Sequence, residues 1–324
     1  MWRMKVLVQF LLALLPGGER INYLLQRLKG SHRPSRMARR ILEMADELAL
    51  VAESGRLGGG HVVEIGTGWD GIGAMMLYLL GARKVSTYDH VRHVRYKLAR
   101  RAVEQIGANL PKIAAAASMA EETLAQRLRP LKEAGDLETL FQRAGIDYVA
   151  PGDGARTGLP AGSVDLVYSH AVLEHVYEKA VGELTVEARR VLAPGGVAFH
   201  LIGLGDHYAS DRRGVSGVNF LKYRPWVWNL WVKNRISYHN RLREKQFIEI
   251  FQAHGATVRV ARHLIRPKDL EALKTMDVDP TFAGMTREEL AVFNTAVVLS
   301  FPEAAEQEKT QETDRRQPVD PPCE

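Results

Sequence analysis

The sequence predicts an α/β fold in which helices cover both faces of a doubly wound, mostly parallel sheet. The first observation is the alternation of helical stretches with short, apolar, β-branched segments, which are typical of buried parallel strands. These segments lie at 61–65, 84–89, 147–150, 164–169 and 197–203. The second observation is a glycine-rich turn, Gly66 to Gly71, that follows the first segment and precedes a helical stretch. Strand, glycine turn and helix in this order are typical of a βαβ unit.

Helices are expected in the intervals between these strands. They are predicted at 35–56, 71–81, 91–107, 178–193 and 242–254, with a longer helical insertion across 118–144. Pro194-Gly195-Gly196 ends the helix at 178–193 and turns the chain into the next strand. Two more strand-like segments, 256–264 and 294–301, lie apart from the others, beyond a tryptophan-rich stretch at 219–241.

Composition divides the 324 residues into three parts. Residues 1–34 form a basic arm, because residues 1–40 carry nine Lys and Arg against one acid in a chain whose net charge is +6. Residues 35–301 form one domain, with a core at 60–205 and a substrate or lid region at 206–241. Residues 302–324 are rich in Glu, Gln, Thr and Pro and are predicted to be disordered.

The basic arm contains two short apolar segments with basic flanks. The run Val6–Leu15 has ten residues, which is too short to span a bilayer as a helix. The second segment places Ile21, Leu24, Leu25 and Leu28 on one helical face. Such helices suit peripheral contact of residues 1–30 with an anionic membrane surface. The alternatives are packing of the arm on the domain and, less favoured, a cleaved signal peptide.

Composition also excludes several classes of function. The single cysteine, Cys323, is the penultimate residue, which excludes a disulfide framework, a cysteine-rich metal site and a catalytic thiol in the core. A reducing compartment fits, so we expect a cytoplasmic protein, with the inner membrane surface as a peripheral location. Basic residues beyond position 40 are balanced by acids, so no nucleic-acid partner is expected. No metal site is predicted, and the oligomeric state is left open.

Polar residues near the ends of the first two strands indicate a ligand site. The pattern Gly66-x-Gly68-x-x-Gly71 leaves backbone N–H groups and open space at the start of a helix. Asp89 ends the second strand, where a carboxylate can accept both hydroxyls of a ribose; its alternative role is a helix N-cap before Val91. Glu64 would repel a pyrophosphate, which raises the alternative of a ligand with an adenosine and no pyrophosphate.

More polar residues follow the third and fourth strands. Asp153 lies at the same edge of the sheet, where a carboxylate can accept a hydrogen bond from an adenine amino group. The fourth strand ends in Ser169-His170, and Glu174-His175 follow. In doubly wound sheets, residues just past the strand ends face the ligand crevice.

The chain resembles the class I S-adenosylmethionine-dependent methyltransferases. Within that class it is similar to the methyltransferase type 11 group, whose members act on small molecules. The matching motifs are VVEIGTGWDG, TYD, APGDGARTGLPAGSVDLVYSHAVLEHV and EARRVLAPGGVAFHLI, which together cover about residues 60–205. The resemblance implies a Rossmann-like sheet of seven strands, the last one antiparallel, and S-adenosylmethionine as cofactor. One departure is Asp70, where many members have a third glycine; here the glycine is Gly71.

The resemblance also implies roles for individual residues. The expected cofactor-binding residues are Glu64, Gly66, Thr67, Gly68, Asp89, Asp153, Gly154 and Ser169. Among them, Asp89 would bind the ribose hydroxyls and Asp153 the adenine edge. Glu64 would favour the sulfonium or amino end of the cofactor. A nicotinamide cofactor is disfavoured, since no Tyr-x-x-x-Lys pair occurs in the chain.

Methyl transfer to a hydroxyl requires a general base. His170, His175 and His207 are candidates because imidazole titrates near neutral pH. Asp206 and His207, which follow the fifth strand, are the preferred catalytic pair, with His170 as a further catalytic candidate. The expected acceptor is a small molecule, a glycan precursor or a lipid. The alternatives are a binding protein at the membrane surface that has lost catalysis and, less favoured, an NAD(P)-dependent oxidoreductase.

The tryptophan-rich stretch bears on the acceptor. Trp226, Trp228 and Trp231 are three of the five tryptophans in the chain. Three interpretations of these tryptophans are open: a hydrophobic lid over the pocket, a dimer contact, or a contact with a membrane that holds the acceptor.

Overall fold

The computed structural model describes residues 7–8, 10–13, 15, 21, 33–52, 57–209, 214–232 and 238–302. The predicted amphipathic arm lies almost entirely outside the described residues, and so does the predicted disordered tail beyond Pro302. Within the described part of the chain, none of the helices combines the length and the apolar character that crossing a membrane requires.

A seven-stranded sheet forms the centre of the molecule, in the order β3-β2-β1-β4-β5-β7-β6. The strands are β1 (His61–Ile65), β2 (Lys84–Tyr88), β3 (Ile146–Val149), β4 (Val164–His170), β5 (Leu192–Gly203), β6 (Thr257–Ile265) and β7 (Val292–Ser300). The first five pair in parallel, and β7 is antiparallel to both β5 and β6. This topology confirms the predicted α/β fold with a doubly wound sheet and an antiparallel last strand.

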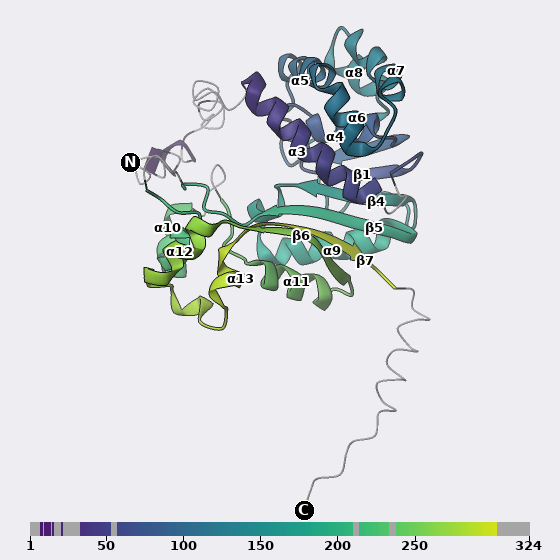
Figure 1. Ribbon diagram of the computed structural model, residues 1–324. Helices are drawn as coiled ribbons and strands as arrows, with labels where there is room; N and C mark the ends of the chain where they lie inside the picture. The colour runs from purple at the N-terminus through teal and green to yellow at the C-terminus, as the bar shows by residue number, and fades with distance from the viewer. Residues whose placement is uncertain are drawn as a thin grey trace, which may run out of the picture.

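Helices cover both faces of the sheet (Figure 1). One face carries α3 (Pro34–Ala52), α4 (Ile72–Leu79), α5 (Tyr96–Ala108), α6 (Leu110–Ala117), α7 (Glu121–Lys132) and α8 (Leu137–Arg143). The other face carries α9 (Glu178–Val191) and α11 (Glu244–Ala253). The remaining helices are α10 (Pro225–Val232), α12 (Pro267–Thr275) and α13 (Arg287–Ala291), with 3-10 turns at η1 (Leu173–His175), η3 (Asn219–Lys222) and η4 (Pro280–Phe282).

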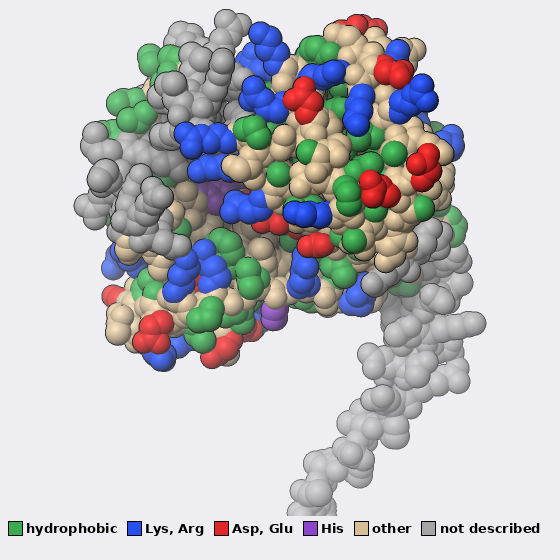
Figure 2. Space-filling view, turned by 45° about the horizontal axis from the view of Figure 1, so that its top comes forward, with side chains coloured by type: hydrophobic (Ala, Val, Ile, Leu, Met, Phe, Trp, Pro, Cys, Tyr) green, Lys and Arg blue, Asp and Glu red, His purple; other side chains and the backbone are tan. Residues whose placement is uncertain are grey.

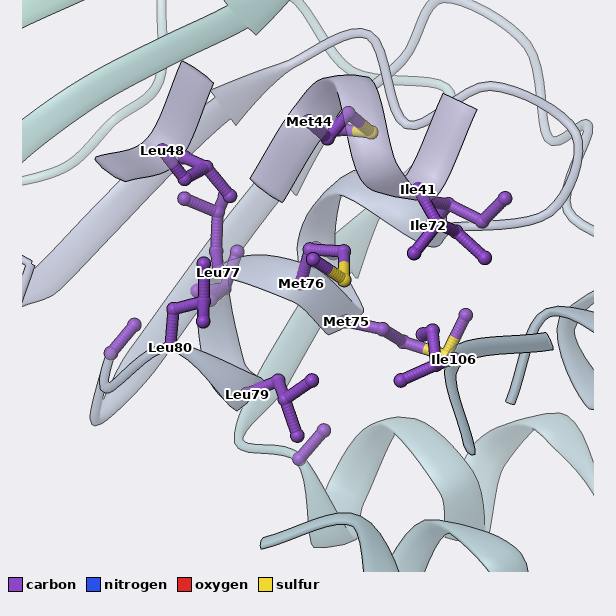
Figure 3. Packing of buried hydrophobic residues seen from close by; sticks show 14 of the residues in the cluster. Ile41, Met44, Leu48, Ile72, Met75, Met76, Leu77, Leu79, Leu80 and Ile106 are labelled. Atoms are coloured by element: carbon purple, nitrogen blue, oxygen red, sulfur yellow. The ribbon is translucent and has the colours of Figure 1, made fainter. Parts of the chain in front are cut away.

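The larger core lies between α3, α4 and the sheet. On α3 the buried residues Met37, Ile41, Met44 and Leu48 recur every three or four positions, so they form one helical face. Figure 3 shows this face of α3 above the apolar residues of α4, with Ile106 of α5 beside them. This packing fixes α3 over the end of the sheet at which the functional residues lie.

A separate apolar cluster supports the region beyond β5. Its buried members are Tyr208, Val218, Phe220, Leu221, Trp228, Leu273, Phe282, Leu290 and Ala291. The described part of the predicted lid region at 206–241 therefore packs against α12, η4 and α13. Trp228 is buried in this cluster, whereas Trp226 is 66% exposed, so the two side chains do not form one continuous surface. The side chain of Trp231 lies outside the described residues.

Several element boundaries differ from the sequence-based expectation. The helix predicted at 91–107 begins only at Tyr96, because residues 90–95 form a loop. The predicted insertion across 118–144 consists of α7 and α8, preceded by α6. Pro194-Gly195-Gly196 lies inside β5 at a register shift instead of between α9 and the strand. No element was predicted for 266–291, which contains α12, η4 and α13.

Candidate active site

The glycine turn follows β1 at the point where the strand order reverses between β1 and β4. Ligands bind at this position in doubly wound sheets. Gly66, Gly68 and Gly71 have φ angles of 86°, 70° and 64°, a region that side chains disfavour. A Cβ on Gly66 would overlap with Cγ2 of Val172, which lies in the loop after β4. A Cβ on Gly68 would meet no atom within 4 Å, so the surface above this residue is open to a ligand.

Asp70 explains the departure in the glycine pattern. Its carboxylate forms an ion pair with Arg40 of α3, and it accepts a hydrogen bond from the backbone N–H of Ile72 at 3.3 Å. Gly71 then adopts the left-handed conformation at the start of α4. The ion pair of Asp70 thus connects the turn to α3. The left-handed residue before α4 is Gly71, one position after the place where many members of the family have a glycine.

Asp89 lies opposite the glycine turn, at the end of β2. Its Oδ2 accepts a hydrogen bond from the N–H of Gly68 at 3.1 Å, and its Oδ1 accepts from Val91 at 3.4 Å. Because α5 begins at Tyr96, Asp89 does not cap a helix that starts at Val91. The helix N-cap alternative was therefore wrong, and the carboxylate stands beside the turn as a ribose ligand would require.

Asp153 follows β3 in the neighbouring loop. The N–H of Gly152 donates to the carbonyl of Asp89 at 2.8 Å, which joins this loop to the end of β2. Asp153 Oδ1 accepts from the N–H of Ala155 at 2.9 Å, and its side chain is 45% exposed. Gly154 packs against Ile65, where a Cβ would lie 2.6 Å from Cδ1 of that residue. The structure therefore brings Asp153 and Gly154 to the same sheet edge as Asp89 and the glycine turn.

Glu64 and Thr67 are directed into the protein beneath the glycine turn. Thr67 Oγ1 lies 2.7 Å from Thr87 Oγ1, and Thr87 donates to Glu64 Oε2 at 2.6 Å. A Cβ on Gly73 of α4 would overlap with Glu64 Oε1, so the carboxyl is enclosed between β1 and α4. Burial raises the pKa of Glu64 to about 8, with smaller contributions from Asp89 and Asp70 in the same direction. A cationic ligand end nearby would lower that pKa again.

The end of β4 presents two histidine contacts on opposite faces of the sheet. His170 Nδ1 lies 2.8 Å from Oε2 of Glu47 on α3, with only 16% and 4% of the two side chains exposed. Ser169 is fully buried on the other face, and its hydroxyl lies 2.8 Å from His200 Nδ1. Burial lowers the pKa of His200 to about 4, so this histidine is neutral. The Ser169 hydroxyl is thus already hydrogen-bonded beneath the crevice, whereas His170 lies at the crevice edge.

The end of β5 carries Asp206 and His207. Asp206 is 4% exposed; its carboxylate accepts from the N–H of Tyr208 at 2.7 Å and from the side-chain amide of Asn219 at 3.2 Å. His207 is exposed, and its ring stacks on His239 at 4.5 Å and faces His175 at 4.9 Å. Asp206 therefore holds the turn that presents His207. Figure 2 shows histidine in a hollow among Lys and Arg side chains on the face that it displays.

Two buried acids near this edge of the sheet, Glu47 and Glu174, were not predicted as site residues from the sequence. Glu47 is an acid on the buried face of an amphipathic helix, and this position in the helical pattern could have identified it from the sequence. Glu174 was noted only as part of a motif, yet its side chain is buried at 2% exposure. A polar residue at a position where the pattern requires an apolar one indicates a functional or paired group.

The arrangement fits S-adenosylmethionine. Positive φ angles and the open surface at Gly68 allow close approach of a ligand to the turn, and Asp89 and Asp153 are acceptors on adjoining loops. This set contains hydrogen-bond acceptors for hydroxyl and amino groups, with Glu64, whose pKa is raised to about 8 by burial, beneath the turn.

Comparison with known proteins identifies a methyltransferase domain in this chain. A family model described as a methyltransferase domain matches residues 64–200. A comparison with curated proteins finds no match. Among solved structures, phosphoethanolamine N-methyltransferase 2 of Haemonchus contortus is 16% identical with a TM-score of 0.43; the alignment covers 86% of this chain and 59% of that one.

Two bacterial or archaeal structures are similar to the same degree. Geranyl diphosphate C-methyltransferase from Streptomyces coelicolor is 13% identical, with 79% of each chain covered and a TM-score of 0.41. An S-adenosylmethionine-dependent methyltransferase from Methanosarcina mazei is 13% identical, with 76% of this chain and 94% of that chain covered and a TM-score of 0.42. The family match covers the core of the sheet, so residues 64–200 form a methyltransferase domain.

Proposed function

We propose that the protein methylates a hydroxyl group of a small molecule, glycan precursor or lipid, with His170 as the general base. The contact between His170 and Glu47 carries this proposal. A carboxylate can only accept, so His170 Nδ1 donates its proton and Nε2 is left as the basic atom. A histidine oriented by a buried carboxylate is the arrangement that general-base catalysis uses.

The cofactor side of the crevice would be formed by Gly66, Gly68, Asp89 and Asp153. The glycines admit the ligand to the backbone, and the two carboxylates accept hydrogen bonds from its hydroxyl and amino groups. S-adenosylmethionine supplies a methyl group on a sulfonium that is already activated for displacement. The protein's remaining tasks are to orient the acceptor, to exclude water and to remove the hydroxyl proton.

Asp206 is a positioning residue in this proposal, and His207 belongs to the acceptor side. The carboxylate of Asp206 is occupied by Tyr208 and Asn219, which argues against a role as base. His207 is exposed beside His175, at the ends of two adjacent strands. We therefore assign the proton transfer to His170 and acceptor contacts to His207.

A hollow of about 270 Å³ supports an acceptor with an apolar part. Its lining includes Trp228, Tyr238, His239 and Phe282, and His239 stacks on His207. Aromatic walls favour an apolar or sugar-like moiety.

Peripheral membrane contact through residues 1–30 would bring the protein to a lipid-linked acceptor. Binding of the full chain to anionic liposomes would test this membrane contact.

The first experiment is calorimetric titration of the full chain with S-adenosylhomocysteine, with NADH as the control ligand. Micromolar binding of S-adenosylhomocysteine alone supports the cofactor site, and binding of NADH alone contradicts it. Incubation with methyl-labelled S-adenosylmethionine and with glycan or lipid extracts then tests transfer. Cofactor binding without labelling of any hydroxyl acceptor would favour a protein that has lost catalysis.

A further inference from the structure

A second group of polar side chains lies beyond β4 and β5, outside the contacts assigned to the cofactor. Glu174 and His175 belong to η1, directly after β4, and His207 follows β5. One ligand atom from each of these three residues lies within 4.8 Å of the other two. Because β4 and β5 are parallel neighbours, their carboxyl ends bring the three side chains to the same edge of the sheet.

Glu174 has an unsatisfied carboxyl oxygen. The side chain is 2% exposed, and its buried Oε2 has no hydrogen-bond partner among the described residues. Its other oxygen packs against Gly203, where a Cβ would lie 2.5 Å away. Burying such a group without a partner is unfavourable, and a cation beside it would offset that cost.

His175 is oriented as a metal ligand would be. Its Nδ1 lies 2.8 Å from the carbonyl oxygen of Tyr238, and a carbonyl can only accept, so Nδ1 carries the proton. The lone pair is therefore on Nε2. Histidines that bind metals usually donate their other ring N–H to a carbonyl or carboxylate in this way.

His207 is held by its neighbours on two sides. Its ring stacks on His239 with an interplanar angle of 17°, and its turn is fixed by the hydrogen bond from Tyr208 N–H to Asp206. His207 is an exposed residue, and one of its ring nitrogens lies within 4.8 Å of a ligand atom of Glu174 and of His175. A ligand that is positioned before the metal binds loses little entropy on binding.

We propose that Glu174, His175 and His207 bind one divalent transition-metal cation, with Zn²⁺ as the reference ion, and leave a coordination position open for the acceptor oxygen. Two imidazoles and one carboxylate are the ligand set of catalytic zinc sites, which keep a fourth position open. Zn²⁺ bonds of about 2.0–2.1 Å place donor atoms roughly 3.3 Å apart in a tetrahedron. Small displacements of the three side chains, with the contacts of His175 and His207 kept, would close the remaining distance.

The site adjoins the glycine turn. Gly66 packs against Val172, two residues before Glu174, so the cation would lie on the acceptor side of the crevice. This inference rests on the proposed methyl transfer to a hydroxyl. A cation that binds the acceptor oxygen lowers the pKa of the hydroxyl, whose proton passes to His170. The oxygen then forms its bond to the methyl carbon while the carbon–sulfur bond breaks, which yields a methyl ether and S-adenosylhomocysteine.

The test is calorimetric titration of the metal-free full chain with ZnCl₂, and with MgCl₂ in parallel. We expect one Zn²⁺ site in the wild type and binding at least about 10-fold weaker in Glu174→Gln, His175→Ala and His207→Ala. His263→Ala is the matched control, because His263 forms an exposed pair with Glu244 at 3.2 Å and its loss should leave Zn²⁺ binding unchanged. Circular dichroism checks that each variant is folded.

The outcomes separate this site from the proposed function. Absence of Zn²⁺ binding, equal binding in all three variants, or a preference for Mg²⁺ would overturn the cation site. S-adenosylhomocysteine is titrated in the same samples. If it binds and Zn²⁺ does not, only the cation site fails; if Zn²⁺ binds and S-adenosylhomocysteine does not, the proposed function fails and the cation site stands.

Discussion

His170 Nδ1 lies 2.8 Å from Oε2 of Glu47, although the two residues are 123 positions apart in the chain. The contact exists because α3 packs across the face of the sheet and places Glu47, the one buried acid of this helix, over the end of β4. This contact joins α3, the helix that precedes the sheet in the chain, to the end of β4, where the cofactor and acceptor would meet.

Removing this pair should impair turnover more than binding. We expect His170→Ala to lower kcat by about 10²–10⁴-fold, since it removes the general base. Glu47→Gln should lower kcat by up to about 100-fold, because the imidazole loses its orientation. Labelled-methyl assays give kcat, and calorimetry should show S-adenosylhomocysteine affinity within about twofold of wild type.

The matched control for this pair is Glu43→Gln. Glu43 lies on the same helix, forms an exposed ion pair with Arg39, and should be replaceable without an effect on kcat. Equal kcat in the His170→Ala variant and the wild type would remove His170 from the mechanism.

Asp89 should determine cofactor affinity. Replacing it with Ala removes the acceptor for ribose hydroxyls and the contact with Gly68 N–H. Hydrogen bonds to a charged group contribute about 1.5–3 kcal/mol, so S-adenosylhomocysteine binding should weaken by at least about 10-fold and become undetectable if both hydroxyl contacts are lost. Asp147→Ala, which affects an exposed carboxylate paired with Lys84, should bind normally. Unchanged affinity in Asp89→Ala would refute the site assignment.

Glu64 should make stability depend on pH. Burial raises its native pKa to about 8, while the unfolded value is near 4.5, so between these values the unfolded chain ionises and the native one does not. The wild type should therefore lose stability relative to Glu64→Gln as pH rises from about 5 to 8, by up to about 1.4 kcal/mol per pH unit, with no further change above pH 8. Urea denaturation at several pH values measures the difference.

The control for Glu64 is an exposed acid on a neighbouring helix. Glu104 is 61% exposed on α5, so Glu104→Gln should show no such pH trend relative to wild type. A stability difference between Glu64→Gln and wild type that is constant from pH 5 to 8 would mean that Glu64 keeps an ordinary pKa in the native state.

Arg243 should be a major contributor to stability. It is fully buried and donates to the carbonyls of Leu204 at 2.5 Å, Leu290 at 2.9 Å and Val292. Arg243→Leu leaves these carbonyls without a partner and should lower the free energy of unfolding by about 3 kcal/mol or more. Arg287→Leu, at an exposed position on α13, should change it by less than about 0.5 kcal/mol. Equal midpoints in urea for the two variants would contradict this role.

The elements that could be predicted from the sequence are those with strong local signals. The strand at 61–65 was predicted with its observed bounds because a buried apolar run and a glycine turn delimit it. The start of α5 was misplaced by five residues, because Asp89 and Val91 resemble a helix start; the N–H of Val91 does donate to Asp89 Oδ1, but the helix begins only at Tyr96. Residues 266–291 gave no clear pattern, since their apolar residues pack on the cluster around Trp228 and not on the sheet.

By itself, the sequence determined the α/β fold and the parallel core of the sheet, and it predicted a cofactor site around Gly66, Gly68 and Asp89. These follow from periodicity and from motifs that are contiguous in the chain. Only the tertiary structure decided which acid orients His170, that Asp206 supports its turn, and that Glu174, His175 and His207 come together. The reason is physical: packing of α3 and pairing of β4 with β5 join residues that are distant in sequence, and local patterns contain no information about such contacts.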